Sequence, residues 1–121
     1  MPGTNLTPKQ IAGAFSSHKF ESAFPYLAQD IKWNVVGGEQ LDGKDSVVKA
    51  CDDLANHLKD VATSFGNFRT IVWENSVVID SLAEYTDKDK DVSVVASCDI
   101  YTFADGKVTE ITSYNLEICS R

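Results

Sequence analysis

A β-branched and aromatic pattern near the C-terminus predicts two long neighbouring strands, at Val92–Ala104 and Lys107–Glu117. The residues between them are Asp105 and Gly106. This dipeptide favours a two-residue hairpin turn, because both central residues of such a turn adopt a positive φ. The sequence therefore predicts an antiparallel hairpin here.

Two more strands are predicted just before this hairpin, at Phe65–Glu74 and Ser76–Thr86. Asn75 marks the turn between them. Residues 87–91 are five consecutive charged side chains, a pattern typical of a solvated loop tip. The second half of the chain is thus expected to form four sequential strands.

The first half is predicted to be mainly helical. Thr7 and Gln10 have the spacing of a capping box, with Pro8 at the first helical position, so a helix is expected over Pro8–Ser17. A second short helix follows, with Pro25 as an irregularity. Its apolar positions are Phe20, Ala23, Phe24 and Leu27.

Between these helices and the late strands, alternation over Ile31–Val36 predicts one strand, which Gly37 and Gly38 end. Gln40–Gly43 is expected to be a turn or a very short strand. A long amphipathic helix is then predicted from Asp45 to about Val61. Its apolar stripe is Val47, Val48, Cys51, Leu54, Ala55, Leu58 and Val61.

The predicted order is helix, helix, strand, helix and four strands. Meandering strands that follow helices favour an α+β fold, with an antiparallel sheet covered on one side. The chain has 121 residues and shows no linker or repeat, so it is expected to be one domain, with residues 1–6 as a loose lead-in.

Composition and charge narrow the classes of partner. The formal charge is −7, with no basic stripe, which disfavours nucleic acid. No apolar run approaches the ~20 residues of a membrane span, and the N-terminus lacks the pattern of a secretory signal. Cys51, Cys98 and Cys119 are odd in number and widely spaced, so we expect free thiols and a cytoplasmic protein.

Asp99 is the candidate functional residue that stands out. It is a lone carboxylate in the middle of an apolar strand. Burying such a group is costly unless it is paired, hydrogen-bonded or neutralised. A carboxyl group in an apolar pocket has a raised pKa and can act as a general acid or base. The alternative is a structural Asp that bonds the backbone or faces solvent.

Three segments resemble a known superfamily. They are Tyr26–Trp33, Leu41–Gly43 before the long helix, and the closing hairpin that begins at Asp99. In this order they are similar to the cone fold shared by nuclear transport factor 2, ketosteroid isomerase and the SnoaL-like polyketide cyclases. The resemblance implies a curved sheet around the third helix, with an apolar cavity whose mouth is lined by the first two helices.

The resemblance also implies a homodimer through the outer face of the sheet. On the strand of Asp99 the opposite face is mostly apolar, as this interface requires. Its residues are Val94, Ala96, Cys98, Ile100 and Thr102.

For chemistry, Asp99 matches the isomerase Asp that donates a hydrogen bond to the developing oxyanion. The isomerase's general base and its Tyr donor correspond to Val35 and Ile11 here, so the known steroid isomerase mechanism is disfavoured. SnoaL-like cyclases carry an acid/base Asp near the position of Asn115. That amide can orient a carbonyl or water, or it can hydrogen bond within the sheet.

Apolar side chains near Asp99 are the expected pocket walls. They are Trp33, Tyr26, Val35, Tyr101, Phe103 and Ile111. His18 is expected to be exposed in the turn after the first helix, and His57 lies on the edge of a polar helix face. These two histidines do not have the spacing of a metal pair, so no metal and no cofactor are expected.

The leading hypothesis is therefore cofactor-independent isomerase- or cyclase-type chemistry on a small apolar carbonyl or polyketide-like compound. Asp99 and Asn115 are the candidate catalytic residues. The alternative is a non-catalytic ligand-binding or dimerisation module, and a nuclear-transport role has no supporting motif.

Overall fold

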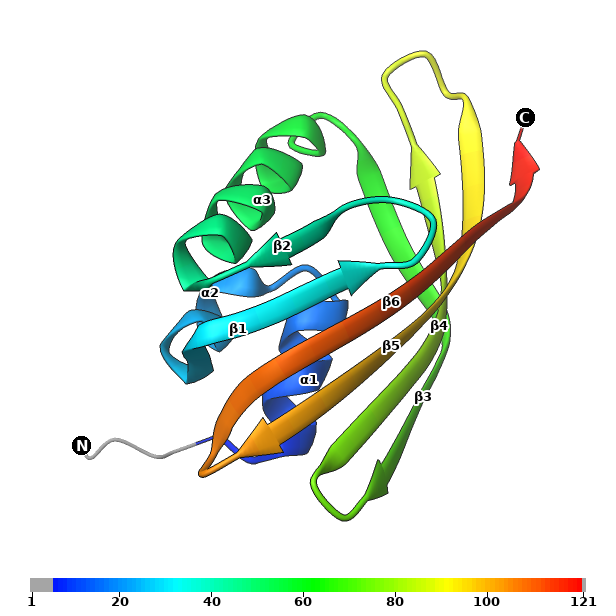
Figure 1. The fold of residues 1–121 in the computed structure, drawn as a ribbon. Coiled ribbons are helices and arrows are strands. Elements are labelled where there is room, and N and C mark those ends of the chain that lie inside the picture. The colour runs from blue at the N-terminus through cyan, green and yellow to red at the C-terminus, as the bar shows by residue number, and fades with distance from the viewer. Residues whose placement is uncertain (1–5, 121) are drawn as a thin grey trace.

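The computed structural model describes residues 6–120, and side chains as far as residue 118; of the predicted lead-in at residues 1–6, the first five lie outside the described part. The protein is an α+β structure with one six-stranded sheet in the order β2-β1-β6-β5-β4-β3 (Figure 1). The strands are β1 (Leu27–Val35), β2 (Gln40–Asp42), β3 (Ala62–Trp73), β4 (Ser76–Thr86), β5 (Val92–Ala104) and β6 (Lys107–Ser120). All neighbours are antiparallel except β1 and β6, which run parallel.

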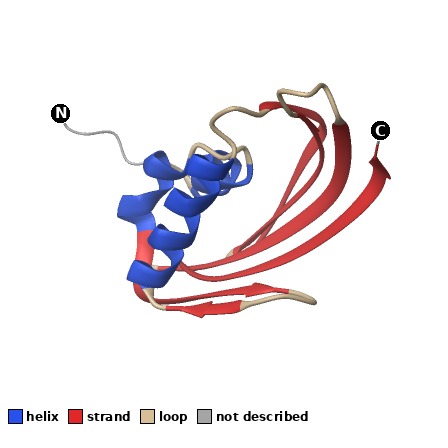
Figure 2. Ribbon diagram, turned by 90° about the horizontal axis from the view of Figure 1, so that it is seen from above, coloured by secondary structure: helices blue, strands red, loops and turns tan. Residues whose placement is uncertain are grey.

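The sheet curves strongly, and the helices lie on its concave side (Figure 2). They are α1 (Pro8–Ser16), α2 (Phe20–Ala23), the 3₁₀ helix η1 (Phe24–Tyr26) and α3 (Lys44–His57). Helix α1 packs on β3, β4 and β5, whereas α3 packs on β1 and β2. Over the described residues, no helix has both the length and the apolar composition that crossing a membrane requires.

The predicted hairpin is confirmed. Asp105 and Gly106 both have positive φ, 52° and 78°, as the two-residue turn requires. The register pairs Asp99 with Ile79 on β4 and with Ser113 on β6. These neighbours therefore share one face of the sheet, the concave one.

A register shift between Thr102 and Phe103 interrupts the alternation of faces along β6. Val108 pairs with Phe103 and is buried, although alternation from Leu116 would place it on the outer face. A bulge of this kind reverses the side on which the preceding residues lie. Ile111 and Ser113 are buried on the concave face, as the sequence indicates.

The predicted capping box of α1 is present in full. The Thr7 hydroxyl accepts from the Gln10 amide, and the Gln10 side chain accepts from the Thr7 amide. The predicted second helix is divided: Pro25 falls in η1, which continues directly from α2. The first strand begins at Leu27, earlier than predicted, because Leu27 already pairs with Val108.

Helix α3 ends at His57, so the prediction that it extends to Val61 is wrong. The Val61 amide instead donates to the Leu58 carbonyl in a turn, and β3 begins at Ala62 by pairing with Thr86. The apolar stripe continues in sequence, but strand pairing overrides it. Within the helix, Val47 and Cys51 are the buried members of the stripe.

The cysteines agree with the expectation of free thiols where they are described. Cys51 and Cys98 form no disulfide, and the side chain of Cys119 lies outside the described part. Burial raises the pKa of Cys51 to about 12, so this thiol stays protonated and packs as a small apolar group.

Candidate functional site

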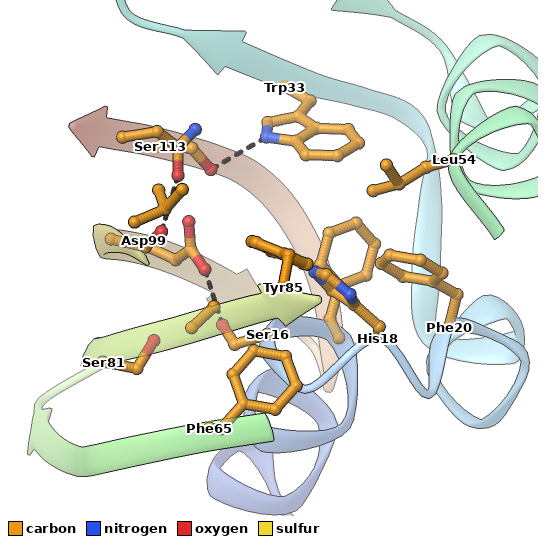
Figure 3. A pocket seen from close by; sticks show the side chains of 15 residues that line it. Ser16, His18, Phe20, Trp33, Leu54, Phe65, Ser81, Tyr85, Asp99 and Ser113 are labelled. Atoms are coloured by element: carbon orange, nitrogen blue, oxygen red, sulfur yellow. Dashed lines mark hydrogen bonds between the residues drawn. The ribbon is translucent and has the colours of Figure 1, made fainter. Parts of the chain in front are cut away.

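A pocket of about 230 Å³ lies between the end of α1 and the concave face of the sheet (Figure 3). Helices and strands far apart in the sequence contribute to its wall. The lining residues are Phe15, Ser16, His18, Phe20, Trp33, Leu54, Phe65, Ser81, Ala83, Tyr85, Val95, Ser97, Asp99, Ser113 and Asn115. Aromatic rings form much of the wall, while the polar groups lie mainly on the sheet strands.

Asp99 is the carboxyl group of this pocket. Burial raises its pKa above the ordinary value, while hydrogen bonds from Ser113 and Ser16 and the nearby His18 partly oppose the rise. In the described part of the chain, neither ion pair involves Asp99; they join Lys49 to Asp53 and Arg69 to Asp80. Hydroxyl groups and, to a smaller degree, the charge of His18 therefore stabilise the charged form.

One hydrogen-bond chain approaches Asp99 from the protein interior. The Ser16 hydroxyl donates to Asp99 Oδ2 at 2.7 Å and lies 2.5 Å from the phenol oxygen of Tyr101. Tyr101 is fully buried, and its phenol has no other hydrogen bond within the described residues. Because Ser16 gives its proton to Asp99, the phenol must donate to Ser16. Asp99 Oδ2 therefore accepts the hydrogen bond from Ser16.

A second chain approaches Asp99 from β1 and β6. The Trp33 indole N–H donates to the Ser113 hydroxyl at 2.9 Å, and Ser113 in turn stabilises the Asp99 carboxylate. In both chains a serine carries the hydrogen bond of a large aromatic residue to the same acid. This arrangement fixes the orientation of the carboxyl group.

His18 was predicted to be exposed, and the structure corrects this. Its ring stacks on Phe20 at 5.3 Å and on Tyr85 at 6.2 Å, and meets Phe65 edge-on at 5.2 Å between ring centroids. Burial lowers the pKa of His18, and the charge of Asp99 partly opposes this. The contacts with Phe65 and Tyr85 come from β3 and β4, which the sequence around His18 does not reveal.

The structure brings only part of the predicted site together. Asp99, Asn115 and Trp33 line the pocket, and Asn115 accepts a hydrogen bond from the Ser97 hydroxyl at 2.7 Å. Tyr101 lies behind the wall and acts through Ser16. The other predicted wall residues are not in the lining: Tyr26, Val35, Phe103 and Ile111.

These four residues have other places in the fold. Phe103 and Ile111 belong to the buried core. The Tyr26 phenol accepts from the Leu6 amide at 3.1 Å, and Val35 ends β1 next to a turn. The sequence does not single out the serines of the pocket, Ser16, Ser81, Ser97 and Ser113, because isolated serines carry no distinguishing pattern.

No group of three or more His, Cys, Asp or Glu side chains is placed to hold a metal ion in the part of the chain that the structure describes. His57 is exposed at the end of α3, away from the pocket lining. The chemistry available in the pocket therefore rests on Asp99, His18 and neutral hydroxyl or amide groups.

Comparison with known proteins identifies the family. The model of the SnoaL-like domain matches residues 9–111, and the chain belongs to this family, within the NTF2-like superfamily. No protein of curated function matches the sequence.

Solved structures support the same fold. An NTF2-like protein of unknown function from Cytophaga hutchinsonii is 31% identical, with a TM-score of 0.77, over 88% of this chain and 93% of that one. A putative polyketide cyclase from Xanthomonas campestris is 14% identical, with a TM-score of 0.69, over 89% and 92%. An LEH-like epoxide hydrolase from M. tuberculosis is 14% identical, with a TM-score of 0.68, over 90% and 82%. The similarity to the polyketide cyclase and to the epoxide hydrolase shows a shared fold and does not indicate a shared activity.

Proposed function

We propose that the protein catalyses cofactor-independent acid/base chemistry on a small carbonyl compound, with Asp99 as the general base. The observation that supports this proposal is the environment of the Asp99 carboxyl group. This group is buried beside a pocket, forms no ion pair among the described residues and is held by hydroxyl donors. A carboxylate with a raised pKa is a better base than an exposed one.

The pocket limits the size of the substrate. Its volume of about 230 Å³ equals that of ~8 water molecules in the liquid. Sites for drug-sized ligands usually enclose ~300–1,000 Å³. A compound with one ring or a short chain fits within this space, whereas a fused tetracyclic polyketide or a steroid would extend out of it. Aromatic walls favour a flat, apolar body, and Asn115 at the rim can orient a polar group.

Proton exchange tests this function without knowledge of the natural product. Small ketones such as cyclohexanone and cyclohexenone would be incubated with the protein in deuterated buffer, and loss of α-proton signals followed by NMR. We expect faster exchange with the wild type, and a ~10²–10⁴-fold slower rate with Asp99→Asn. Equal rates for the two proteins, or no acceleration over buffer for any ketone, would overturn the proposal.

The second candidate is a non-catalytic pocket that binds a small organic cation. Aromatic rings around one carboxylate suit a methylated ammonium ion through cation–π contacts. The observation that favours it is the aromatic enclosure by Phe15, Phe20, Trp33, Phe65 and Tyr85. Titration with tetramethylammonium separates the two functions: Asp99→Asn should abolish binding of the cation, with no ketone exchange in either protein.

A homodimer through the outer sheet face is proposed as the assembly. This face carries exposed apolar side chains on both β3 and β6, which a second copy would bury. They are Ile71, Trp73, Tyr114, Leu116 and Ile118, between 48% and 71% exposed. The pocket opens on the opposite, concave face, so this assembly leaves it accessible.

A further inference from the structure

We propose that His18 is the second proton-transfer group of this pocket and works opposite Asp99, on the oxygen of the bound carbonyl compound. The inference rests on the proposed acid/base function and adds a residue to it. The two side chains come from different parts of the fold, the turn after α1 and the middle of β5, and both line the same cavity. Figure 3 shows them on either side of it.

The orientation of His18 is fixed by its aromatic neighbours. Phe20 and Tyr85 stack on the ring, and Phe65 closes one edge. No hydrogen bond joins the imidazole to another residue of the described chain, so its N–H is available to a ligand. A group that touches substrate is best held in this way, by packing that leaves its polar atoms unused.

The backbone at His18 supports a positional role. Its φ is 67°, in the left-handed region that few non-glycine residues adopt and in which His, like Asn and Asp, occurs more often than most. Such a conformation costs of the order of 1–3 kcal/mol and tends to occur at functional sites. The turn is held by the His18 amide, which donates to the Phe15 carbonyl, and by the Lys19 amide, which donates to Ala14.

The charges around His18 single out Asp99 as its partner. The titratable groups that face it are Tyr85 on β4 and Asp99 on β5, and on its outer side Lys19, Glu21, Cys51 and Asp52. Only Asp99 has a charge effect on the pKa of His18. Burial lowers the pKa of His18 and raises that of Asp99, so the two ionisations approach each other. Over the interval between them the pair holds one proton.

The proposed enolisation uses only this one proton. Asp99 as carboxylate removes a proton from the carbon next to the carbonyl, and the C–H electron pair forms the C=C bond of an enol. The carbonyl π electrons move to oxygen, which takes the proton of the His18 imidazolium. The products are an enol, neutral His18 and protonated Asp99. In a substrate whose C=C bond joins the β and γ carbons, the enol is a conjugated dienol. Return of the Asp99 proton to the γ carbon moves the C=C bond next to the re-formed carbonyl, and the O–H proton goes back to His18, so this isomerisation needs no co-reactant.

The assignment of roles follows from the hydrogen bonds. Asp99 receives donors from Ser16 and Ser113, which stabilise it as a carboxylate and prepare it to accept. His18 has no such donors and no acceptor within the described residues, so it is the member of the pair that can donate. General acid catalysis at an oxygen next to general base catalysis at carbon is the arrangement that enolisation requires.

Binding of 4-nitrophenol tests the role of His18, because a phenolate resembles an enolate and its visible absorption reports its ionisation. His18→Asn keeps a residue that tolerates the left-handed backbone. His18→Phe keeps an aromatic ring between Phe20 and Tyr85 but removes the nitrogens. His57→Asn, on the exposed end of α3, is the matched control. We expect a tenfold or larger loss of affinity in both His18 variants, and a change within twofold in the control.

The result for His18→Phe separates proton transfer from packing. Wild-type affinity in that variant would assign His18 to the wall alone and overturn the inference. The ketone-exchange assay separates this failure from failure of the proposed function. If exchange depends on Asp99 and both His18 variants exchange at the wild-type rate, only the role of His18 is refuted; if exchange is absent throughout, the proposed function falls and this inference with it.

Discussion

Replacing Ser16 by Ala removes the hydroxyl that links the Tyr101 phenol to Asp99. Both partners lose a hydrogen bond, but they are affected differently. The Tyr101 phenol is fully buried and has Ser16 as its partner, so it becomes an unsatisfied polar group. Asp99 keeps Ser113, and its pKa rises further because one of the donors that lowers it is gone. We therefore expect Ser16→Ala to destabilise the protein mainly through Tyr101.

The magnitude follows from ordinary hydrogen-bond energetics. An unsatisfied buried polar group costs ~1–3 kcal/mol, and a lost hydrogen bond to an acid about 1 kcal/mol, so Ser16→Ala should cost ~2–4 kcal/mol. Tyr101→Phe leaves Ser16 bonded to Asp99 and should cost about 1 kcal/mol. The double variant has no orphaned phenol and should cost ~2 kcal/mol, clearly less than the sum of the two single changes.

Urea unfolding of the wild type and the three variants, followed by circular dichroism near neutral pH, measures these differences. A parallel NMR titration of Asp99 should show its pKa higher in Ser16→Ala than in the wild type. Additive free energies in the double variant would refute the hydrogen-bond chain, as would an unchanged Asp99 pKa in Ser16→Ala.

Three further predictions concern pH, backbone and assembly. The folded-state pKa of Asp99 is raised, so its contribution to stability is complete below the unfolded pKa and is lost as pH rises through the folded one. Asp99→Asn should accordingly gain stability relative to the wild type as pH rises from the unfolded pKa of ~3.9 to the raised folded pKa, by ~1.4 kcal/mol for each unit between them; a constant difference in urea unfolding would contradict this. Gly13→Ala in α1 meets no atom within 4 Å and should raise the free energy of unfolding by ~0.5–1 kcal/mol, whereas Gly106→Ala, at φ 78°, should lower it by ~1 kcal/mol. Thermal unfolding measures both changes, and the prediction fails unless Gly13→Ala stabilises the protein and Gly106→Ala destabilises it. If the proposed dimer forms, Leu116→Asp should give the mass of a monomer in light scattering without loss of secondary structure, and a mass equal to that of the wild type would exclude this face as the interface.

The parts of the fold that the sequence predicts well are those set by neighbours along the chain. The capping box of α1 and the Asp-Gly hairpin are examples, because their hydrogen bonds and backbone angles involve residues a few positions apart. The end of α3 was predicted less well. Its apolar stripe continues past His57, but pairing of Ala62 with Thr86 ends the helix, and Thr86 lies far along the chain.

The candidate site likewise combines one residue that the sequence indicates with partners that only the fold brings to it. Asp99 stands out from the sequence because a carboxylate in an apolar strand has a cost that needs an explanation, and its partners do not stand out. Ser16 is 83 residues away from Asp99, and no local pattern marks it. The predicted wall residues Phe103 and Ile111 share the face of Asp99 but pack into the core, because the sheet curves and the helices cover only part of it.

The amino-acid sequence by itself determined the order and type of the elements, the face on which Asp99 lies and the family to which the chain belongs. Hydrophobic periodicity and turn chemistry are local, so these features need no knowledge of the fold. Only the tertiary structure decided that His18 faces the pocket, that Tyr101 acts through Ser16 and that the cavity is small. Those properties depend on strand curvature and on contacts between distant segments, which set distances and burial that no stretch of sequence carries.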